Sequence, residues 1–469
     1  MKFGFGNKLS LLPFAVGLVF LLMGLSAPGQ SPAYTNIIFV YADDMGFMDT
    51  HYNGSDFYET PNLDRFAQEN LVFPNAYAGG ANCAPSRACL LSGQYNPRTS
   101  VYAVGSTSRG PENKMRLTPV PNKTYLEPGN FTMAQALKSA GYATGIFGKW
   151  HLGNKKNNAD PANMGFDVVM DNNGDPKKSV VEDPKAMFEI TDSAISFITK
   201  NKDKPFFAYI AHHAIHGRHQ ARPATFEKFK NKPKGKYHND VLMAGSIYDF
   251  DEAFAQLLAA IKANGLEENT MIVVSSDNGA INSSVQEPLR GNKGAYYEGG
   301  IRVPFIVRWP GKTRAGVNLT PIINLDLYPT FANLAGAQVP ANKVLDGENL
   351  LPLFSAQNTH TERDKIFWHF PGYLDNPVVR GRDTIFRTRP VTVMRKGDYK
   401  IFIYHEEWLL DGGFDRRAFN NAVEVYHLKT DPGEHVNIAN SQPAKRDELI
   451  RDLLDWMKAT DAKWAIVPR

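Results

Sequence analysis

The segment CAPSRAC, residues 83–89, contains the only two cysteines of the 469-residue chain. The residues after Pro85 have a helical pattern, and helical geometry would separate the two cysteine Cα atoms by about 9 Å, too far for a disulfide. The sequence has no CxxC pair and no second cysteine cluster to complete a zinc site. Two interpretations remain, an inert buried thiol and a cysteine that takes part in chemistry.

Oxygen-bearing side chains follow two apolar segments. Asp43 and Asp44 come directly after NIIFVYA, and Asp277 and Asn278 come directly after MIVVSS. Ligands of open α/β sheets bind at the carboxyl ends of the strands, and carboxylate and amide oxygens suit calcium or magnesium. Such pairs also begin turns, but two of them, each following an apolar strand, favour a site for a hard cation.

Groups that could bind an anion lie in the same kind of position. Cys83 lies just before a predicted helix, whose free N–H groups and dipole favour an anion, and Arg87 lies one helical turn further on. Alone, each such residue is more often a solvated loop residue, but together they describe a site that hydrolyses an anionic ester. The remaining members follow three other segments: Lys149, His151, the four histidines of residues 209–220, and Lys293.

The elements that must position these residues alternate between strand and helix. This order predicts an open α/β fold, a large, mostly parallel sheet with helices on both faces. After about residue 360 the pattern changes to antiparallel strands, residues 392–404 and 421–428, followed by a helix over 445–460. We therefore expect a smaller C-terminal α+β domain with an antiparallel sheet. The expected parallel strands are residues 36–42, 143–148, 205–211, 271–276 and 303–309, with helices at 63–70, 132–141, 194–201 and 246–265.

Several motifs, in order, carry a family resemblance. CAPSR resembles the C-x-P-S-R signature of the type I sulfatases, and GYATGIFGKWH resembles the second signature of that family. The similarity continues through YADDMG, SSDNGA, GNKGAYYEGGIRVP, LDGENLLPL and GDYKIF…VYHLKTDPGEHVNIA, and it covers nearly everything from residue 36 onward. It implies an alkaline-phosphatase-like fold, with a catalytic domain over residues 34–360 and a C-terminal subdomain over 361–469. Within the family, the chain resembles bacterial carbohydrate sulfatases.

The resemblance also implies roles for individual residues. In this family the cysteine of C-x-P-S-R is oxidised by a maturation enzyme to formylglycine, whose hydrated aldehyde is the nucleophile, so Cys83 would not act as a thiol and Cys89 would be structural. Asp43, Asp44, Asp277, Asn278 and the modified Cys83 would bind calcium, in preference to magnesium. Arg87 would position the hydrated aldehyde, Lys149 and Lys293 would contact the sulfate, and His151 would assist breakdown of the covalent sulfate intermediate.

The catalytic histidine of residues 209–220 has two candidates. The family pattern aligns His216 with the proton donor to the leaving alcohol, for which Lys293 is another candidate, and His213 is the alternative to His216. This sequence has Gly217-Arg218 where the family usually has Thr-Pro. Arg218 and His219 could therefore line a subsite for an acidic sugar, or they could be solvated loop residues.

The N-terminal region has the pattern of a secretory signal. Lys2 and Lys8 precede the apolar run LLPFAVGLVFLLMGLSA, which ends in small residues, so we predict a signal peptide over residues 1–27. The run is close to membrane-spanning length, but Pro13 and Gly17 favour cleavage over a retained anchor. We expect an exported protein, periplasmic or secreted, that keeps no stable membrane anchor.

Together, the motifs and the family resemblance predict a calcium-dependent hydrolase of sulfate monoesters that acts on sulfated carbohydrate. A phosphonate or phosphodiester hydrolase of the same superfamily is the alternative enzyme, and a non-catalytic binding protein for sulfated glycans is the alternative from another class. Nucleic acid is not an expected partner, because the net charge is only +4 and the basic residues are scattered.

Overall fold

The structure is a computed structural model and describes residues 1, 4, 6, 34–170 and 181–468. Apart from residues 1, 4 and 6, the predicted signal peptide lies outside the described residues. Within the described residues, no helix has both the length and the hydropathy needed to cross a bilayer. Tyr34–Arg469 form one structural unit, and a domain boundary at residue 360 stays a prediction.

The larger sheet has eight strands in the described part of the chain and confirms the predicted α/β class. Its core is parallel, with β1 hydrogen-bonded between β6 and β7, and with β4 on the far side of β6. The strands, in sheet order, are β5 (Val168–Met170), β4 (Ala143–Gly148), β6 (Phe206–Ala211), β1 (Asn36–Ala42), β7 (Thr270–Ser276), β8 (Phe305–Arg308), β2 (Leu71–Val72) and β9 (Gly316–Val317).

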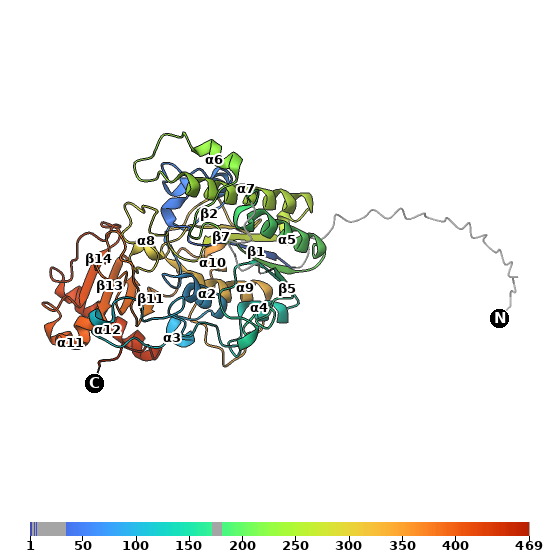
Figure 1. Ribbon diagram of the computed structural model, residues 1–469. Coiled ribbons are helices and arrows are strands. Elements are labelled where there is room, and N and C mark those ends of the chain that lie inside the picture. Colours follow the sequence, from blue (N-terminus) through green and yellow to red (C-terminus); the bar gives the residue numbers. More distant parts are fainter. Residues whose placement is uncertain (2–3, 5, 7–33, 171–180, 469) are drawn as a thin grey trace. The chain divides into compact units, whose positions relative to one another are not determined.

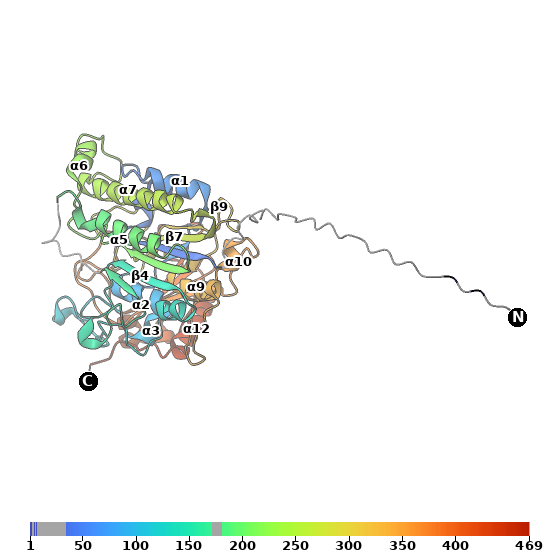
Figure 2. The ribbon, with the colours of Figure 1, turned by 90° about the vertical axis from the view of Figure 1, so that its right-hand side faces the viewer.

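Helices cover both faces of this sheet (Figure 1, Figure 2). Because side chains alternate along a strand, Ile38 and Val40 of β1 pack with one helical layer, and Ile37 and Phe39 pack with the other. The first layer contains α1 (Pro61–Glu69), α5 (Met187–Lys200), α6 (Pro223–Phe229) and α7 (Val241–Ala263), and the second contains α2 (Cys83–Ser92), α4 (Met133–Ser139) and α9 (Leu327–Ala335).

The register of the central strands decides where the functional residues meet. Ala42 at the end of β1 pairs with Ser276 at the end of β7, and Gly148 at the end of β4 pairs with Ala211 at the end of β6. Tyr41 also pairs with Ala211. The residues that follow these four strands therefore leave the sheet side by side at one edge, as expected for the carboxyl ends of parallel strands.

One strand prediction was wrong in its direction. Residues 303–309 were expected to form another parallel strand, but β8 is antiparallel to β7, with Val273 opposite Val307. A parallel neighbour needs a crossover connection, usually a helix. The connection between β7 and β8 contains only the four-residue helix α8 (Glu298–Ile301) in the described structure, so the chain returns beside β7 without crossing over.

The second sheet confirms the predicted antiparallel C-terminal region. It has the order β11 (Lys365–Phe370), β12 (Val391–Lys396), β13 (Tyr399–Tyr404) and β14 (Val423–His427). The long helix α12 (Pro443–Ala459) packs on β12 and β13, and these strands appear in orange beside α12 in Figure 1. The other short elements are α3 (Asn96–Thr99), α10 (Leu351–Phe354), α11 (His405–Leu410), β3 (Ala76–Tyr77) and β10 (Ile322–Ile323).

Candidate active site

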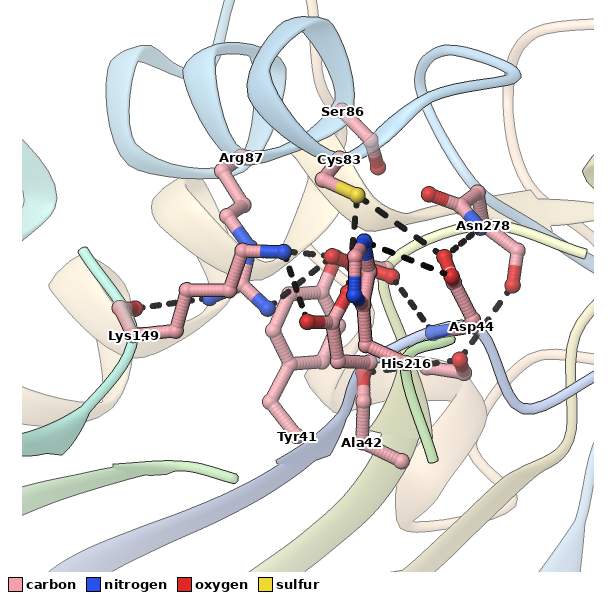
Figure 3. Close-up of polar contacts among 12 residues, drawn as sticks. Tyr41, Ala42, Asp44, Cys83, Ser86, Arg87, Lys149, His216 and Asn278 are labelled. Carbon is pink, nitrogen blue, oxygen red and sulfur yellow. Dashed lines mark hydrogen bonds and ion pairs between the residues drawn. The ribbon is translucent and has the colours of Figure 1, made fainter. Parts of the chain in front are cut away.

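Cys83 is the first residue of α2 and is almost completely buried. Asn82 precedes it in an extended conformation, so the side chain of Cys83 leaves the chain where the helix begins. Its Sγ lies 3.4 Å from Asp43 Oδ1, 3.7 Å from Asp44 Oδ1 and 3.1 Å from Lys293 Nζ. Figure 3 shows Cys83 and Arg87 extending from the same helix toward the edge of the sheet. Cys89 is a second free, buried thiol, and its Sγ contacts Gly79 O instead.

The residues predicted to bind a metal form one buried group. One side-chain ligand atom from each of Asp43, Asp44, Cys83 and Asp277 lies within 4.8 Å of the others. Asp277 Oδ1 accepts a hydrogen bond from the backbone N–H of Asp44, and Asn278 Nδ2 donates to Asp44 Oδ1 at 2.8 Å. Asp44 has a φ of 69°, an unfavourable value for a residue other than glycine. Backbone strain of this kind is common at functional sites.

Three cations surround these carboxylates. Lys149 Nζ is 2.6 Å from Asp43 Oδ2, and Lys293 Nζ is 2.6 Å from Asp44 Oδ1. Arg87 is fully buried and donates from Nε to Asp277 Oδ2 at 2.9 Å and from Nη1 to the carbonyl oxygen of Lys149 at 2.8 Å. The site therefore places carboxylates and cations in alternation, and the cations come from three separate segments of the chain.

Burial and neighbouring charge set the protonation of this group. Burial opposes ionisation of Asp43, but attraction by Lys149 and the other nearby cations exceeds that effect and holds the pKa of Asp43 well below its usual value. Burial and repulsion by Asp43 raise the pKa of Asp277 to about 6, against the attraction of Arg87. Burial also raises the pKa of the Cys83 thiol, so an unmodified Cys83 is a protonated, weak nucleophile.

The donor atoms fit a hard divalent cation. Burial, and then repulsion by the neighbouring carboxylates, raise the pKa of Asp277, and a cation between the carboxylates would relieve this repulsion. Asn278 Oδ1 is buried beside them and accepts no hydrogen bond in the described part of the chain, so it is a spare oxygen ligand. Carboxylate and amide oxygens are the ligands that calcium and magnesium prefer.

His151 lies close to the cationic side of the site. It follows Lys149 after the end of β4 and has a φ of 64°, in the left-handed region. Burial, and then repulsion by Lys149 and Arg87, lower the pKa of His151 to about 3. Its Nδ1 is buried and makes no hydrogen bond to any described residue. His151 is therefore a neutral imidazole in the folded protein.

Two backbone hydrogen bonds join the histidine segment to Asp43, the residue that follows β1. Asp43 N donates to Ala214 O, and Ile215 N donates to Asp43 O, both at 2.6 Å. His216 Nε2 then lies 3.8 Å from Asp44 Oδ2, and the side chain of His216 is 49% exposed. His213 is buried. The structure thus places His216 at the open side of the carboxylate group and His213 inside the protein.

Arg218 and His219 lie differently from each other. Arg218 is exposed, whereas His219 Nδ1 is 3.0 Å from Asp240 Oδ2, and the other oxygen of Asp240 caps the first turn of α7. His219 therefore contacts the start of α7, and none of its hydrogen bonds or ion pairs to described residues goes to the predicted metal ligands. A role for both residues in substrate binding stays a prediction.

Sequence reasoning missed several residues near the site. Tyr209 OH accepts from Arg87 Nη1 at 3.4 Å, and Arg87 lies over the ring of Tyr41. Arg387 Nη1 donates to the carbonyl oxygen of Lys293 at 3.3 Å. The tyrosines lie within apolar strands, where an aromatic residue usually indicates core, and nothing in the sequence near Arg387 pointed to the site.

The fold and this group of residues define a hydrolase of anionic esters on an alkaline-phosphatase-like scaffold. The sequence model of the sulfatase family matches residues 35–337 of this chain. The model of a second family, described as N-sulphoglucosamine sulphohydrolase, C-terminal, matches residues 292–463. The chain belongs to the sulfatase family and is a sulfuric ester hydrolase, as the motifs predicted.

Individual relatives agree with this assignment. A sulfatase of Formosa agariphila is 30% identical over 88% of this chain and 85% of its own length. N-acetylgalactosamine-6-sulfatase of Mus musculus is 31% identical over 92% of this chain and 87% of its own length. Among solved structures, Ps i-CgsB in complex with k-i-k-neocarrahexaose superimposes with a TM-score of 0.72 at 27% identity, covering 93% of this chain and 95% of that one.

Proposed function

We propose that this sulfatase hydrolyses sulfate monoesters of carbohydrates with a formylglycine made from Cys83 and with a divalent cation, calcium in preference to magnesium. The observation that carries the proposal is the position of Cys83 at the start of α2. Its Sγ lies within 3.7 Å of two carboxylates and one lysine ammonium group. A thiol with a raised pKa is poorly suited to attack a sulfate ester itself, whereas an oxygen nucleophile at the same position would lie among metal ligands and cations.

Conversion of the Cys83 thiol to an aldehyde needs water and a two-electron oxidant. The side chain CH2SH and one water give CHO, hydrogen sulfide, two protons and two electrons, and the electrons pass to an oxidant used by the maturation enzyme. When hydrated, the aldehyde supplies a hydroxyl nucleophile and a second hydroxyl for regeneration. Pro85 and Arg87 belong to the segment that the maturation enzyme would read.

Asp43, Asp44, Asp277 and Asn278 would hold the cation, together with the modified residue 83. A bound divalent cation supplies positive charge that lowers the pKa of a hydroxyl and attracts sulfate oxygens. The spare oxygen of Asn278 and the mutual repulsion of the three carboxylates support this assignment.

The remaining residues would act on the sulfate and on protons. Lys149 and Lys293 would contact sulfate oxygens, and Arg87 would orient the nucleophile, each placing positive charge where negative charge develops; one such contact is typically worth about 3–4 kcal/mol. Neutral His151 would accept a proton in the second half of the reaction. His216 would donate a proton to the leaving alcohol, since it is the more accessible of the two candidate histidines.

Two similarities support a carbohydrate substrate. The related mouse enzyme is named for an N-acetylgalactosamine sulfate, and Ps i-CgsB was solved with a sugar, k-i-k-neocarrahexaose. The predicted signal peptide over residues 1–27 agrees with an exported enzyme, periplasmic or secreted, that meets polysaccharide outside the cytoplasm. We also propose that residues 34–360 are the catalytic domain and that residues 361–469 are a subdomain packed on it.

The test begins with the protein expressed together with its maturation enzyme. The mass of the peptide that contains Cys83 is expected to match an aldehyde, and sulfate release from sulfated oligosaccharides is expected to depend on added calcium. An unmodified Cys83 in an active protein would contradict the formylglycine assignment. Matched aryl sulfate and aryl phosphonate esters, compared by kcat/KM, would separate a sulfatase from a phosphonate hydrolase.

A further inference from the structure

Two arginines lie on either side of one extended segment at the rim of the site. Arg109 N donates to Tyr373 O at 3.2 Å, and Arg387 N donates to Leu374 O at 2.7 Å. Tyr373 and Leu374 therefore lie between the two arginines, and Asp375 follows them directly. These residues come from separate loops, which isolated backbone bridges bring together.

Arg387 is a half-buried cation without a carboxylate partner. Among the described residues it makes no ion pair, and its hydrogen bonds go to two carbonyl oxygens, from Nε to Asn376 O at 3.1 Å and from Nη1 to Lys293 O at 3.3 Å. Its stem packs on Gly294, where a Cβ would lie 2.2 Å from Arg387 Cδ. Burying a guanidinium without a counter-ion is costly, so this position favours a negatively charged group from outside the chain.

Arg109 supplies a second cation, so positive charge exceeds negative charge beside Asp375. Arg109 Nε lies 3.3 Å from Asp375 Oδ1, yet it makes no hydrogen bond of good geometry to a described residue. Asp375 thus pairs with Arg109 and leaves Arg387 without an ion pair among the described residues. Burial, and then repulsion by Arg109, lower the pKa of Arg387, which agrees with an excess of positive charge at this rim.

The position of Arg387 relative to the nucleophile indicates what this charge would bind. Arg387 Nη1 contacts the carbonyl oxygen of Lys293, and Lys293 Nζ contacts Cys83 Sγ. A single lysine side chain therefore separates the free guanidinium edge from residue 83. One lysine residue and two contacts therefore set an upper limit on the distance between Arg387 and residue 83, within the span of a short oligosaccharide.

We propose that Arg387, with Arg109 beside it, binds a second anionic group of the substrate, a sulfate or a carboxylate, while the scissile sulfate lies at residue 83. A guanidinium binds either anion through a pair of parallel N–H···O bonds. The inference rests on the proposed function and narrows it. The substrate is a polyanionic sugar, and the enzyme discriminates it from a sugar that carries only the scissile sulfate.

The test compares substrates within one variant. The substrates are sulfated disaccharides of galactose and of N-acetylhexosamine, and each is used in three forms. One form carries a single sulfate, one carries a second sulfate, and one carries the carboxylate of a uronic acid. The kcat/KM of the enzyme is measured for each form. The Arg387→Gln variant is expected to lower the ratio of dianionic to monoanionic kcat/KM about tenfold to hundredfold, the usual value of a charge-assisted hydrogen bond. Arg109→Gln is expected to lower it less, because Asp375 already contacts Arg109.

The control variant is Arg314→Gln, which removes an exposed arginine between β8 and β9 and is expected to leave the ratio unchanged. The second anion, sulfate or carboxylate, for which Arg387→Gln lowers the kcat/KM ratio more is the group that the subsite binds. An equal fall for monoanionic and dianionic sugars, or a ratio no different from that of the control, would overturn the proposal.

Failure of the proposed function would look different. In that case the wild-type protein releases sulfate from none of these sugars. Binding of the sugars to the subsite is then measured by calorimetry with the Cys83→Ala variant. Tighter binding of the disulfated than of the monosulfated sugar, lost when Arg387→Gln is added, supports the subsite independently of turnover, and equal binding of the two sugars overturns it.

Discussion

Two of the buried groups of oppositely charged side chains in the described part of the chain differ in how far solvent can reach them. The first is the catalytic cluster, made of Asp43, Asp44, Asp277, Arg87, Lys149 and Lys293. The second, here called the sheet cluster, lies between α8 and the C-terminal sheet and is made of Tyr77, Glu298, Arg395, Lys400 and Glu434. In the sheet cluster Lys400 Nζ lies 2.9 Å from a carboxylate oxygen of Glu298 and 2.9 Å from one of Glu434.

Access distinguishes the two clusters. Lys400 is completely buried, whereas the side chains of Lys149 and Lys293 are 12% and 13% exposed. Glu298, Lys400 and Glu434 come from the motifs YYEGG, GDYK and DPGEH, which are as much part of the family resemblance as CAPSR. Motif similarity therefore selects residues that join α8 to the C-terminal sheet as well as residues of the candidate active site, and the structure tells them apart.

Removing the proposed nucleophile, Cys83, has the largest expected effect and acts beside the catalytic cluster only. Cys83→Ala should lower sulfate release by at least about 10⁴-fold, as loss of a catalytic nucleophile does. Its melting temperature should stay within a few degrees of wild type, because the change removes one small side chain. Activity and thermal unfolding measured on the same preparation check this. Retention of activity would remove Cys83 from the chemistry, and the matched variant Cys89→Ala serves as control.

Breaking the sheet cluster should have the opposite profile. Lys400→Met leaves two buried carboxylates without their shared cation, and such a loss typically costs about 3–5 kcal/mol of stability. We expect a lower midpoint of urea unfolding with KM for substrate unchanged in the folded fraction. Lys463→Met, at an exposed ion pair with Asp461, is the control and should change stability by less than about 1 kcal/mol. A stable Lys400→Met variant with altered KM would place the sheet cluster in the active site.

The comparison also shows what sequence could and could not predict. The central strands and the polar residues after them were predictable, since apolar runs followed by Asp-Asp, Asp-Asn or Lys-Trp-His are local patterns. The direction of β8 was not predictable from its own residues, because direction depends on the connection before it. Arg109 and Arg387 were missed for a related reason. They come near one another because distant loops pack together, and no local spacing in the sequence indicates that packing.

Removing divalent cations should affect the catalytic cluster and leave the sheet cluster untouched. A ligand present at 100 times its Kd stabilises the folded state by about 2.7 kcal/mol, so added calcium should raise the unfolding midpoint and a chelator should lower it. Asp277→Asn should weaken this response, because it removes one carboxylate from the group. Thermal unfolding against calcium concentration checks the prediction. An identical calcium response in wild type and in Asp277→Asn would place the cation elsewhere.

Acid should destabilise the C-terminal sheet through two buried histidines. Ala465 N donates to His405 Nδ1, so His405 Nε2 donates to Thr392 Oγ1, and the Thr392 hydroxyl in turn donates to His369 Nδ1. This chain of hydrogen bonds requires both imidazoles to be neutral. Burial lowers the pKa of His369 to about 3 and that of His405 well below its usual value.

Because both histidines have lower pKa values in the folded protein than in the unfolded chain, their contribution is complete above about pH 6.5 and is lost as the pH falls toward 3. At pH 5 each should cost roughly 2 kcal/mol of unfolding free energy. His369→Gln, in which the amide can replace one donor and one acceptor, should reduce the loss of stability between pH 7.5 and pH 5, measured by urea unfolding. The exposed His360→Gln variant should keep the wild-type dependence. If His369→Gln and His360→Gln lose stability equally on acidification, the acid sensitivity comes from other groups, such as the carboxylates of the catalytic cluster.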